Sequence, residues 1–109
     1  GVQLPHLSYV GDSVLGTGAH LGAGAKISNF RSLPGEIHLD FSDGRLVLPG
    51  EKFGAVLGDG VEVGCNAVLC PGSVLGPRCV VYPLVGFRGT AEAGTIVKGA
   101  GREQRVPRR

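Results

Sequence analysis

A six-residue repeat constrains the fold of this chain more than any other feature of its sequence. The repeat runs through residues 9–32 and again through residues 57–92, which gives ten blocks in two runs. A period of six matches neither the 3.6-residue period of a helix nor the two-residue alternation of a simple strand. The first position of every block is apolar or aromatic: Tyr9, Leu15, Leu21, Ile27, Leu57, Val63, Leu69, Leu75, Val81 and Phe87.

Two further positions of the block follow rules that have a physical cause. The fifth position is small or β-branched in every block except the one that holds Arg31. We therefore expect the first and fifth positions to point into a narrow interior. The fourth position favours residues that tolerate the positive φ of a tight corner: Asp12, Gly18, Gly24, Gly60, Asn66 and Gly72. Short strands with regular corners, stacked at about 4.8 Å, make a β-solenoid, so the sequence predicts an all-β solenoid over residues 1–101.

Residues 31–52 interrupt the repeat. Apolar and polar residues alternate from Ile37 to Phe41, an Asp-Gly turn follows, and a second apolar run ends at Leu48. Alternation on both sides of such a turn predicts an inserted β-hairpin arm. Because an exposed arm with apolar residues must bury one face, we expect a neighbouring subunit to cover it.

Composition and charge exclude several classes of protein. A mean hydropathy of +0.18 argues against disorder, and no apolar run approaches the roughly 20 residues of a membrane span. Residues 1–101 carry 7 Lys and Arg against 8 Asp and Glu, so we expect no nucleic-acid-binding surface. Residues 102–109 form a basic tail with 4 Arg and 1 Glu. We expect this tail to be a solvated, frayed terminus, the alternative being a contact with a phosphate.

The cysteines and the first residues indicate the cellular setting. Three cysteines without a CxxC pair suggest neither a disulfide framework nor a zinc site, and free thiols suit a reducing cytoplasm. The chain contains no Met and opens without a basic segment before an apolar stretch. We therefore expect no signal peptide and a part of a longer protein.

Several motifs resemble one family. The run from Leu4 to Gly16, LPHLSYVGDSVLG, the run Leu21-Gly22-Ala23-Gly24 and Asn29 resemble the C-terminal left-handed β-helix of bifunctional sugar-1-phosphate nucleotidyltransferase/acetyltransferases. The resemblance covers roughly residues 4 to 100. It implies a left-handed parallel β-helix with three blocks per coil, and a homotrimer with sites between subunits. It also implies acetyl transfer from acetyl-CoA to the amine of an amino-sugar 1-phosphate such as glucosamine-1-phosphate.

The resemblance also implies roles for individual residues on the substrate side. His6 matches the general base, and a neutral imidazole is suited to take a proton from an attacking amine. Tyr9 matches a residue that contacts the sugar phosphate. Asn29 matches a side chain near the acetyl group. His20 stands where the family often has an Asn that binds substrate.

Two residues match the family's acetyl-CoA side. Ala23 lies where the family uses a backbone N–H on the thioester carbonyl, a donor that stabilises a developing oxyanion. Cys65 replaces a Ser that is associated with coenzyme A. The chain departs from the family in having no Lys between Arg31 and Glu51. Two hypotheses therefore stay open: an acetyltransferase domain, or a non-catalytic β-helix that trimerises or regulates a sugar-phosphate nucleotidyltransferase.

A metal site is a further alternative, because the γ-class carbonic anhydrases share the left-handed β-helix and bind zinc through three histidines. The three histidines here, His6, His20 and His38, are widely spaced, and no two of them are five apart. We therefore expect no metal.

Overall fold

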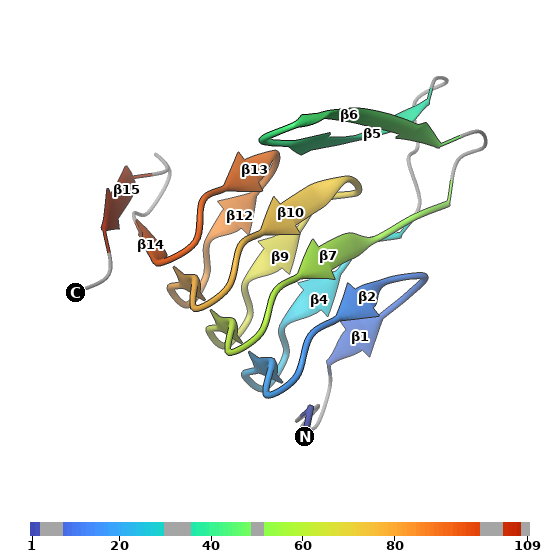
Figure 1. Cartoon of the computed structure of the whole chain (residues 1–109). Coiled ribbons are helices and arrows are strands. Elements are labelled where there is room, and N and C mark those ends of the chain that lie inside the picture. Colours follow the sequence, from blue (N-terminus) through green and yellow to red (C-terminus); the bar gives the residue numbers. More distant parts are fainter. Residues whose placement is uncertain (3–7, 30–35, 49–51, 99–103, 108–109) are drawn as a thin grey trace.

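Short parallel strands build three sheets that enclose a narrow core (Figure 1). The structure is a computed structural model and describes residues 1–2, 8–29, 36–48, 52–98 and 104–107. The first sheet contains β1 (Tyr9–Val10), β4 (Lys26–Ile27), β9 (Val68–Leu69) and β12 (Gly86–Phe87). The second contains β2 (Val14–Leu15), β7 (Ala55–Leu57), β10 (Ser73–Leu75) and β13 (Thr90–Ala91). The third contains β3 (His20–Leu21), β8 (Glu62–Val63), β11 (Val80–Val81), β14 (Thr95–Lys98) and β15 (Gln104–Pro107).

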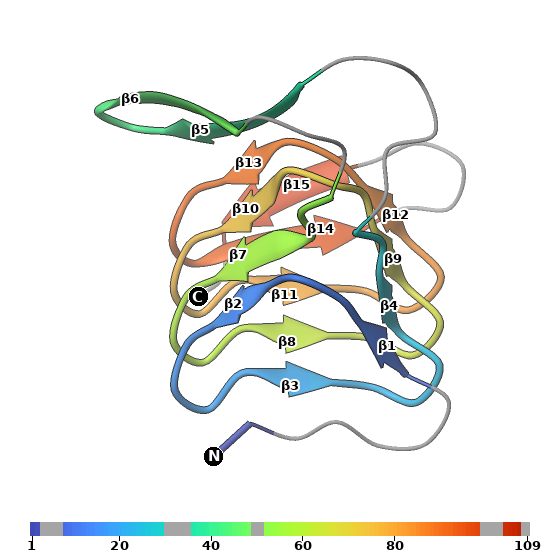
Figure 2. The same cartoon turned by 90° about the vertical axis from the view of Figure 1, so that its right-hand side faces the viewer.

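Each turn of the chain adds one strand to each sheet, so the coils stack from β1–β3 up to β12–β14 (Figure 2). Val56 pairs with Val74 and Glu62 pairs with Val80, in each case three blocks of six further along the chain. This register confirms the β-solenoid expected from the repeat and the three blocks per coil that the family resemblance implies. In the part of the chain that the structure describes, no helix is long and apolar enough to cross a membrane.

Three corners join the sheets, and we name them by the strands that they follow. The first corner follows β1, β4, β9 and β12; the second follows β2, β7, β10 and β13; the third follows β3, β8 and β11. All six predicted fourth positions adopt positive φ at these corners. Arg78 (φ 62°) and Leu84 (φ 67°) also occupy fourth positions and adopt the same conformation, although their residue types did not indicate it.

The core consists of the inward-pointing first and fifth positions. Leu21, Ile27, Leu69 and Phe87 have no exposed surface at all. The prediction was wrong for Tyr9, whose side chain is 51% exposed. Tyr9 pairs with Lys26 instead of with Ile27, the residue three full blocks away. The first block is therefore shifted by one residue, and Val10 packs against the core in place of Tyr9.

The last coil is two residues shorter than three full blocks. Val74 pairs with Thr90 and Val80 pairs with Ile96, each two residues short of three full blocks. Ala91, which the repeat places at a fifth position, therefore lies opposite Leu75, a first position. The tight corner before β13 contains Gly89 with a φ of 94°. The tenth block is thus cut short, yet its small residue still points inward.

The insertion between β4 and β7 forms the predicted hairpin, with β5 (Ile37–Phe41) antiparallel to β6 (Gly44–Leu48). Its loop consists of Ser42 and Asp43, and Gly44 opens the second strand with a φ of 148°. Below the arm, Val14 pairs with Val56 in spite of the inserted segment between them. In the next coil, Val56 pairs with Val74, three full blocks further along the chain. The arm therefore adds length at one corner without changing the register of the coils around it.

The hairpin packs against its own β-helix, beside β10 and β13 (Figure 1). Ile37 and Leu39 are each only 3% exposed, and the Thr90 hydroxyl donates a 2.6 Å hydrogen bond to the Asp40 carbonyl. The expectation from the sequence was that a neighbouring subunit buries this face, whereas the chain itself covers these two side chains. Leu46 and Val47 on β6 stay exposed.

The described part of the basic tail is a strand, which corrects the expectation of a frayed terminus. β15 runs antiparallel to β14 and adds a fifth strand to the third sheet. One Arg105 Nη1–H donates to the Thr90 carbonyl at 2.6 Å, and the guanidinium lies 5.0 Å from the centre of the Phe87 ring. A cation over an aromatic ring is attractive, so this arginine helps to hold the strand in place.

Candidate functional site

Three side chains form a hydrogen-bonded cluster at the first corner. The Tyr9 hydroxyl donates to Oδ1 of Asn29 at 3.0 Å, and Nδ2 of Asn29 donates to Oδ2 of Asp12 at 2.7 Å. Gly11 makes this approach possible, because a Cβ at that position would come within 2.8 Å of the Tyr9 hydroxyl oxygen. Tyr9 and Asn29, two of the residues identified by resemblance, therefore do lie together.

The backbone of the first corner is tied to the strand that follows the hairpin arm. The Asp12 carbonyl accepts a 2.9 Å hydrogen bond from the Gly54 N–H. The Ser13 hydroxyl donates to the Gly11 carbonyl at 2.8 Å and accepts from the Ala55 N–H at 3.0 Å. Asp12 adopts a φ of 42°, a conformation that Asp tolerates better than most residues. These bonds hold the cluster on a rigid part of the β-helix.

Sequence reasoning treated Asp12 only as a corner residue and missed its place in this cluster. The regular repeat does not place the two side chains together, because Asp12 and Asn29 are separated by one residue less than three full blocks, the interval that separates the register partners Tyr9 and Lys26. Residues separated by one coil stack on one another in a solenoid. The shortened first coil thus places the carboxylate of Asp12 beside the amide of Asn29.

Ala23 and Cys65 lie one above the other at the third corner. The coils approach so closely that a Cβ on Gly22 would come within 2.7 Å of the Cys65 nitrogen. The Ala23 carbonyl accepts a hydrogen bond from the Asn66 N–H at 3.1 Å, while none of the described residues accepts from the Ala23 N–H. Ala23 and Cys65 are both exposed. This corner thus presents a backbone donor beside a thiol.

The other residues predicted for the site lie apart from these two groups. His20 is half-buried on β3, in register with Glu62 on the third sheet. His6, the expected general base, falls outside the described residues. Within one chain the described site residues therefore form two groups at two different corners, with His20 on the face that follows the second corner.

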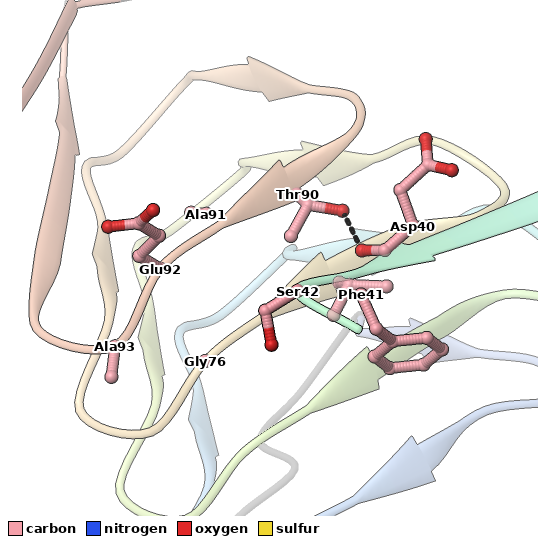
Figure 3. Close-up of a pocket in the computed structure, with 9 residues that line it drawn as sticks. Asp40, Phe41, Ser42, Gly76, Thr90, Ala91, Glu92 and Ala93 are labelled. Carbon is pink, nitrogen blue, oxygen red and sulfur yellow. Dashed lines mark hydrogen bonds between the residues drawn. The ribbon is translucent and has the colours of Figure 1, made fainter. Parts of the chain in front are cut away.

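A pocket of about 550 Å³ opens between the hairpin and the second sheet (Figure 3). Its lining is largely apolar, and the Thr90–Asp40 hydrogen bond closes one side. The lining residues are Asp40, Phe41, Ser42, Val74, Gly76, Thr90, Ala91, Glu92 and Ala93. None of the residues expected from the family resemblance is among them, so this pocket and the Tyr9–Asn29–Asp12 cluster are separate features.

The described residues contain no group of three or more His, Cys, Asp and Glu side chains placed to hold a metal ion. The three cysteines are free thiols: Cys65 is exposed, Cys70 is half-buried and Cys79 is buried. Neither the histidines nor the thiols in this part of the chain therefore gather into a metal centre.

Comparison with solved structures defines the class of the fold. A serine acetyltransferase from Neisseria gonorrhoeae superposes on 98% of this chain and 37% of its own, with a TM-score of 0.67 and 16% identity. An N-acyltransferase from Bacillus cereus, solved with dTDP-4-amino-4,6-dideoxyglucose and coenzyme A, superposes on 99% of this chain and 59% of its own. Its TM-score is 0.68 at 15% identity. The fold is therefore that of the left-handed β-helix acyltransferases.

Sequence comparison identifies the family. A bifunctional sugar-1-phosphate nucleotidylyltransferase/acetyltransferase from Sulfurisphaera tokodaii is 37% identical over 83 residues, which cover 76% of this chain. A bifunctional GlmU protein from Methanococcus vannielii is 38% identical over 85 residues, covering 72% of this chain. The chain thus belongs to the bifunctional sugar-1-phosphate nucleotidyltransferase/acetyltransferases and matches their C-terminal region. It spans about a fifth of the length of these curated relatives. No family model matches the chain.

Proposed function

We propose that the chain is the acetyl-transfer part of a bifunctional sugar-1-phosphate nucleotidyltransferase/acetyltransferase. It moves the acetyl group of acetyl-CoA to the amine of an amino-sugar 1-phosphate in the cytoplasm. The observation that carries the proposal is the 37% identity with the Sulfurisphaera tokodaii protein over 76% of the chain. The Bacillus cereus N-acyltransferase, solved with an amino-sugar nucleotide and coenzyme A, supports it through a shared fold.

The proposed chemistry assigns one role to each residue. His6 takes a proton from the amine as its nitrogen attacks the thioester carbon. The Ala23 N–H and the Asn29 amide stabilise the negative charge that develops on the carbonyl oxygen. The carbon–sulfur bond then breaks, and the thiolate leaves and is protonated to the free thiol of coenzyme A. Tyr9 and His20 hold the sugar, and Cys65 lies against the coenzyme.

The proposed assembly is a homotrimer whose sites lie between subunits. The Tyr9–Asn29 group and the Ala23–Cys65 group occupy different corners of one chain, so a neighbouring chain is needed to bring them to one substrate. An exposed apolar face supports the assembly. Val14 is 57% exposed and stacks with Val56 along the outside of the second sheet, and such faces are commonly buried in subunit contacts.

The test is an acetyl-CoA consumption assay with a panel of amino-sugar 1-phosphates. General-base help is worth about 10²–10⁴ in rate, so His6→Ala lowers kcat by that factor and leaves the trimer intact in light scattering. His6→Gln does not restore the rate, because an amide takes no proton at neutral pH. The matched control is His38→Ala, which removes an exposed histidine from the hairpin and leaves the rate unchanged.

Two outcomes would contradict parts of this proposal. If His6→Ala retains the wild-type rate, the general base is another residue. If the wild-type chain transfers acetyl to none of the amino-sugar phosphates, it is instead a non-catalytic β-helix that trimerises or regulates a nucleotidyltransferase. A stable monomer at micromolar concentration would reject the trimer in both cases.

A further inference from the structure

We propose that Asp12 is a positioning residue, whose carboxylate turns the Asn29 amide so that an N–H, and not the carbonyl oxygen, is offered to the reacting acetyl group. This inference rests on the proposed function and assigns a role to a residue that the sequence indicated only as a corner. Its basis is the hydrogen-bonded cluster of Tyr9, Asn29 and Asp12.

The cluster has only one orientation in which every contact is a hydrogen bond. An ionised carboxylate can only accept, so the group that Asn29 presents to Asp12 must be Nδ2, 2.7 Å from Oδ2. Oδ1 of Asn29 then faces Tyr9 and accepts the hydroxyl proton at 3.0 Å. Exchanging the amide oxygen and nitrogen would set the oxygen against the carboxylate with no proton between them. The charge on Asp12 therefore selects the orientation.

This orientation matters for acetyl transfer. Nδ2 carries two hydrogens, of which Asp12 uses one, so the second is the donor that remains for a ligand. A donor aimed at the carbonyl oxygen of the acetyl group stabilises the negative charge that develops there. The reversed amide would present lone pairs to the same charge and would repel it.

The backbone around Asp12 suits a positioning role, because it connects both ends of the hairpin arm. The Asp12 side chain binds Asn29, which precedes the arm, and the Asp12 carbonyl accepts from Gly54, which follows it. A side chain that orients another must itself be fixed. Its place on a corner with a φ of 42° also limits the substitutions that test the idea, since Asn and Gly tolerate that conformation.

The experiment compares Asp12→Asn and Asp12→Gly with a matched control, Asp59→Asn. Asp59 is also an exposed corner carboxylate, and it accepts a 2.8 Å hydrogen bond from the Thr17 N–H at the second corner. We expect both Asp12 substitutions to lower kcat about 10- to 100-fold, the factor that corresponds to one hydrogen bond to a charged group. The KM for each substrate and the rate of Asp59→Asn stay close to wild type. Unchanged kcat in both Asp12 variants would overturn the proposal.

A second comparison separates positioning from a general structural role. If Asp12 acts through Asn29, then Asp12→Asn lowers kcat no further in an Asn29→Ala background, because the two residues work as a unit. An equal fall in both backgrounds would show that Asp12 acts independently and would refute the idea.

Melting temperatures test the contact without relying on activity. The change caused by Asp12→Gly should differ between the wild-type and Asn29→Ala backgrounds, since only the first contains the contact. Equal changes would mean that the two side chains are not coupled, and the inference would fail. A wild-type chain without transferase activity would instead reject the proposed function, while the coupling would still be measurable.

Discussion

Gly54 joins the hairpin arm to the second coil, and the structure leaves no room for a side chain there. Its N–H donates to the Asp12 carbonyl and its carbonyl accepts from the Gly72 N–H, so it is bonded to the coils on either side. A Cβ would overlap the Ser13 hydroxyl oxygen and the Gly11 carbonyl oxygen, and would lie 2.9 Å from Cγ2 of Ile27. We predict that Gly54→Ala destabilises the fold.

The size of the effect follows from what would have to move. The Gly11 carbonyl is backbone, and the Ser13 hydroxyl is held by two hydrogen bonds, so neither can give way cheaply. Overpacking of this kind costs about 1–3 kcal/mol, and losing the Ser13–Ala55 hydrogen bond adds about 0.5–1.5 kcal/mol. Together these give a loss of about 1.5–4.5 kcal/mol in the free energy of unfolding.

The control is Gly86→Ala on β12, where a Cβ would meet nothing within 4 Å. Replacing a glycine by alanine at an unstrained position stabilises by about 0.4–1 kcal/mol, because the unfolded chain loses freedom. The two substitutions should therefore have opposite signs. Urea unfolding followed by circular dichroism measures both, at one protein concentration because the proposed trimer would contribute to stability. If Gly54→Ala were as stable as Gly86→Ala, the packing described for the first corner would be wrong.

Two further predictions test the coil itself. Leu69→Ala should lower the free energy of unfolding by about 2–5 kcal/mol through lost burial and a cavity, whereas Val68→Ala, one residue earlier and 37% exposed, should lower it far less. Equal losses in urea unfolding would mean that the first position of the block does not point inward. Leu84→Asn should stabilise the chain by about 0.5–1 kcal/mol, since an exposed leucine at a φ of 67° is strained and asparagine tolerates that region. A lower melting temperature would show that Leu84 makes a contact worth more than the strain.

The repeat predicted most of the β-helix because its physical causes are local. A bulky residue at the first position and a small one at the fifth fill a narrow interior in every coil, whatever the neighbouring coils contain. Periodicity fails where a corner changes length. The one-residue shift that exposes Tyr9 and turns Val10 toward the core leaves an apolar or aromatic residue at both positions, so the sequence pattern carries no sign of it.

The site was less predictable, because it depends on how coils and arm meet. The similarity to the family pointed to Tyr9 and Asn29, but the orientation of the Asn29 amide is set by Asp12, one coil away. Similarly, the alternation in β5 shows that Ile37 and Leu39 need cover without showing what covers them. The structure assigns this burial to β10 and β13 of the same chain.

The end of the β-helix at β13 and β14 is closed from two sides. The hairpin packs beside β13, where Thr90 Oγ1 donates to the Asp40 carbonyl. On the other side, β15 pairs along the edge of β14, and Arg105 of β15 donates to the Thr90 carbonyl. An uncovered final coil would offer unpaired backbone groups to any other strand. A stack of identical coils is a natural template for filament growth, in which each new chain repeats the previous one. Here β15 pairs along β14 and the arm packs beside β13, so the last coil presents no free parallel edge at β14 to a further copy.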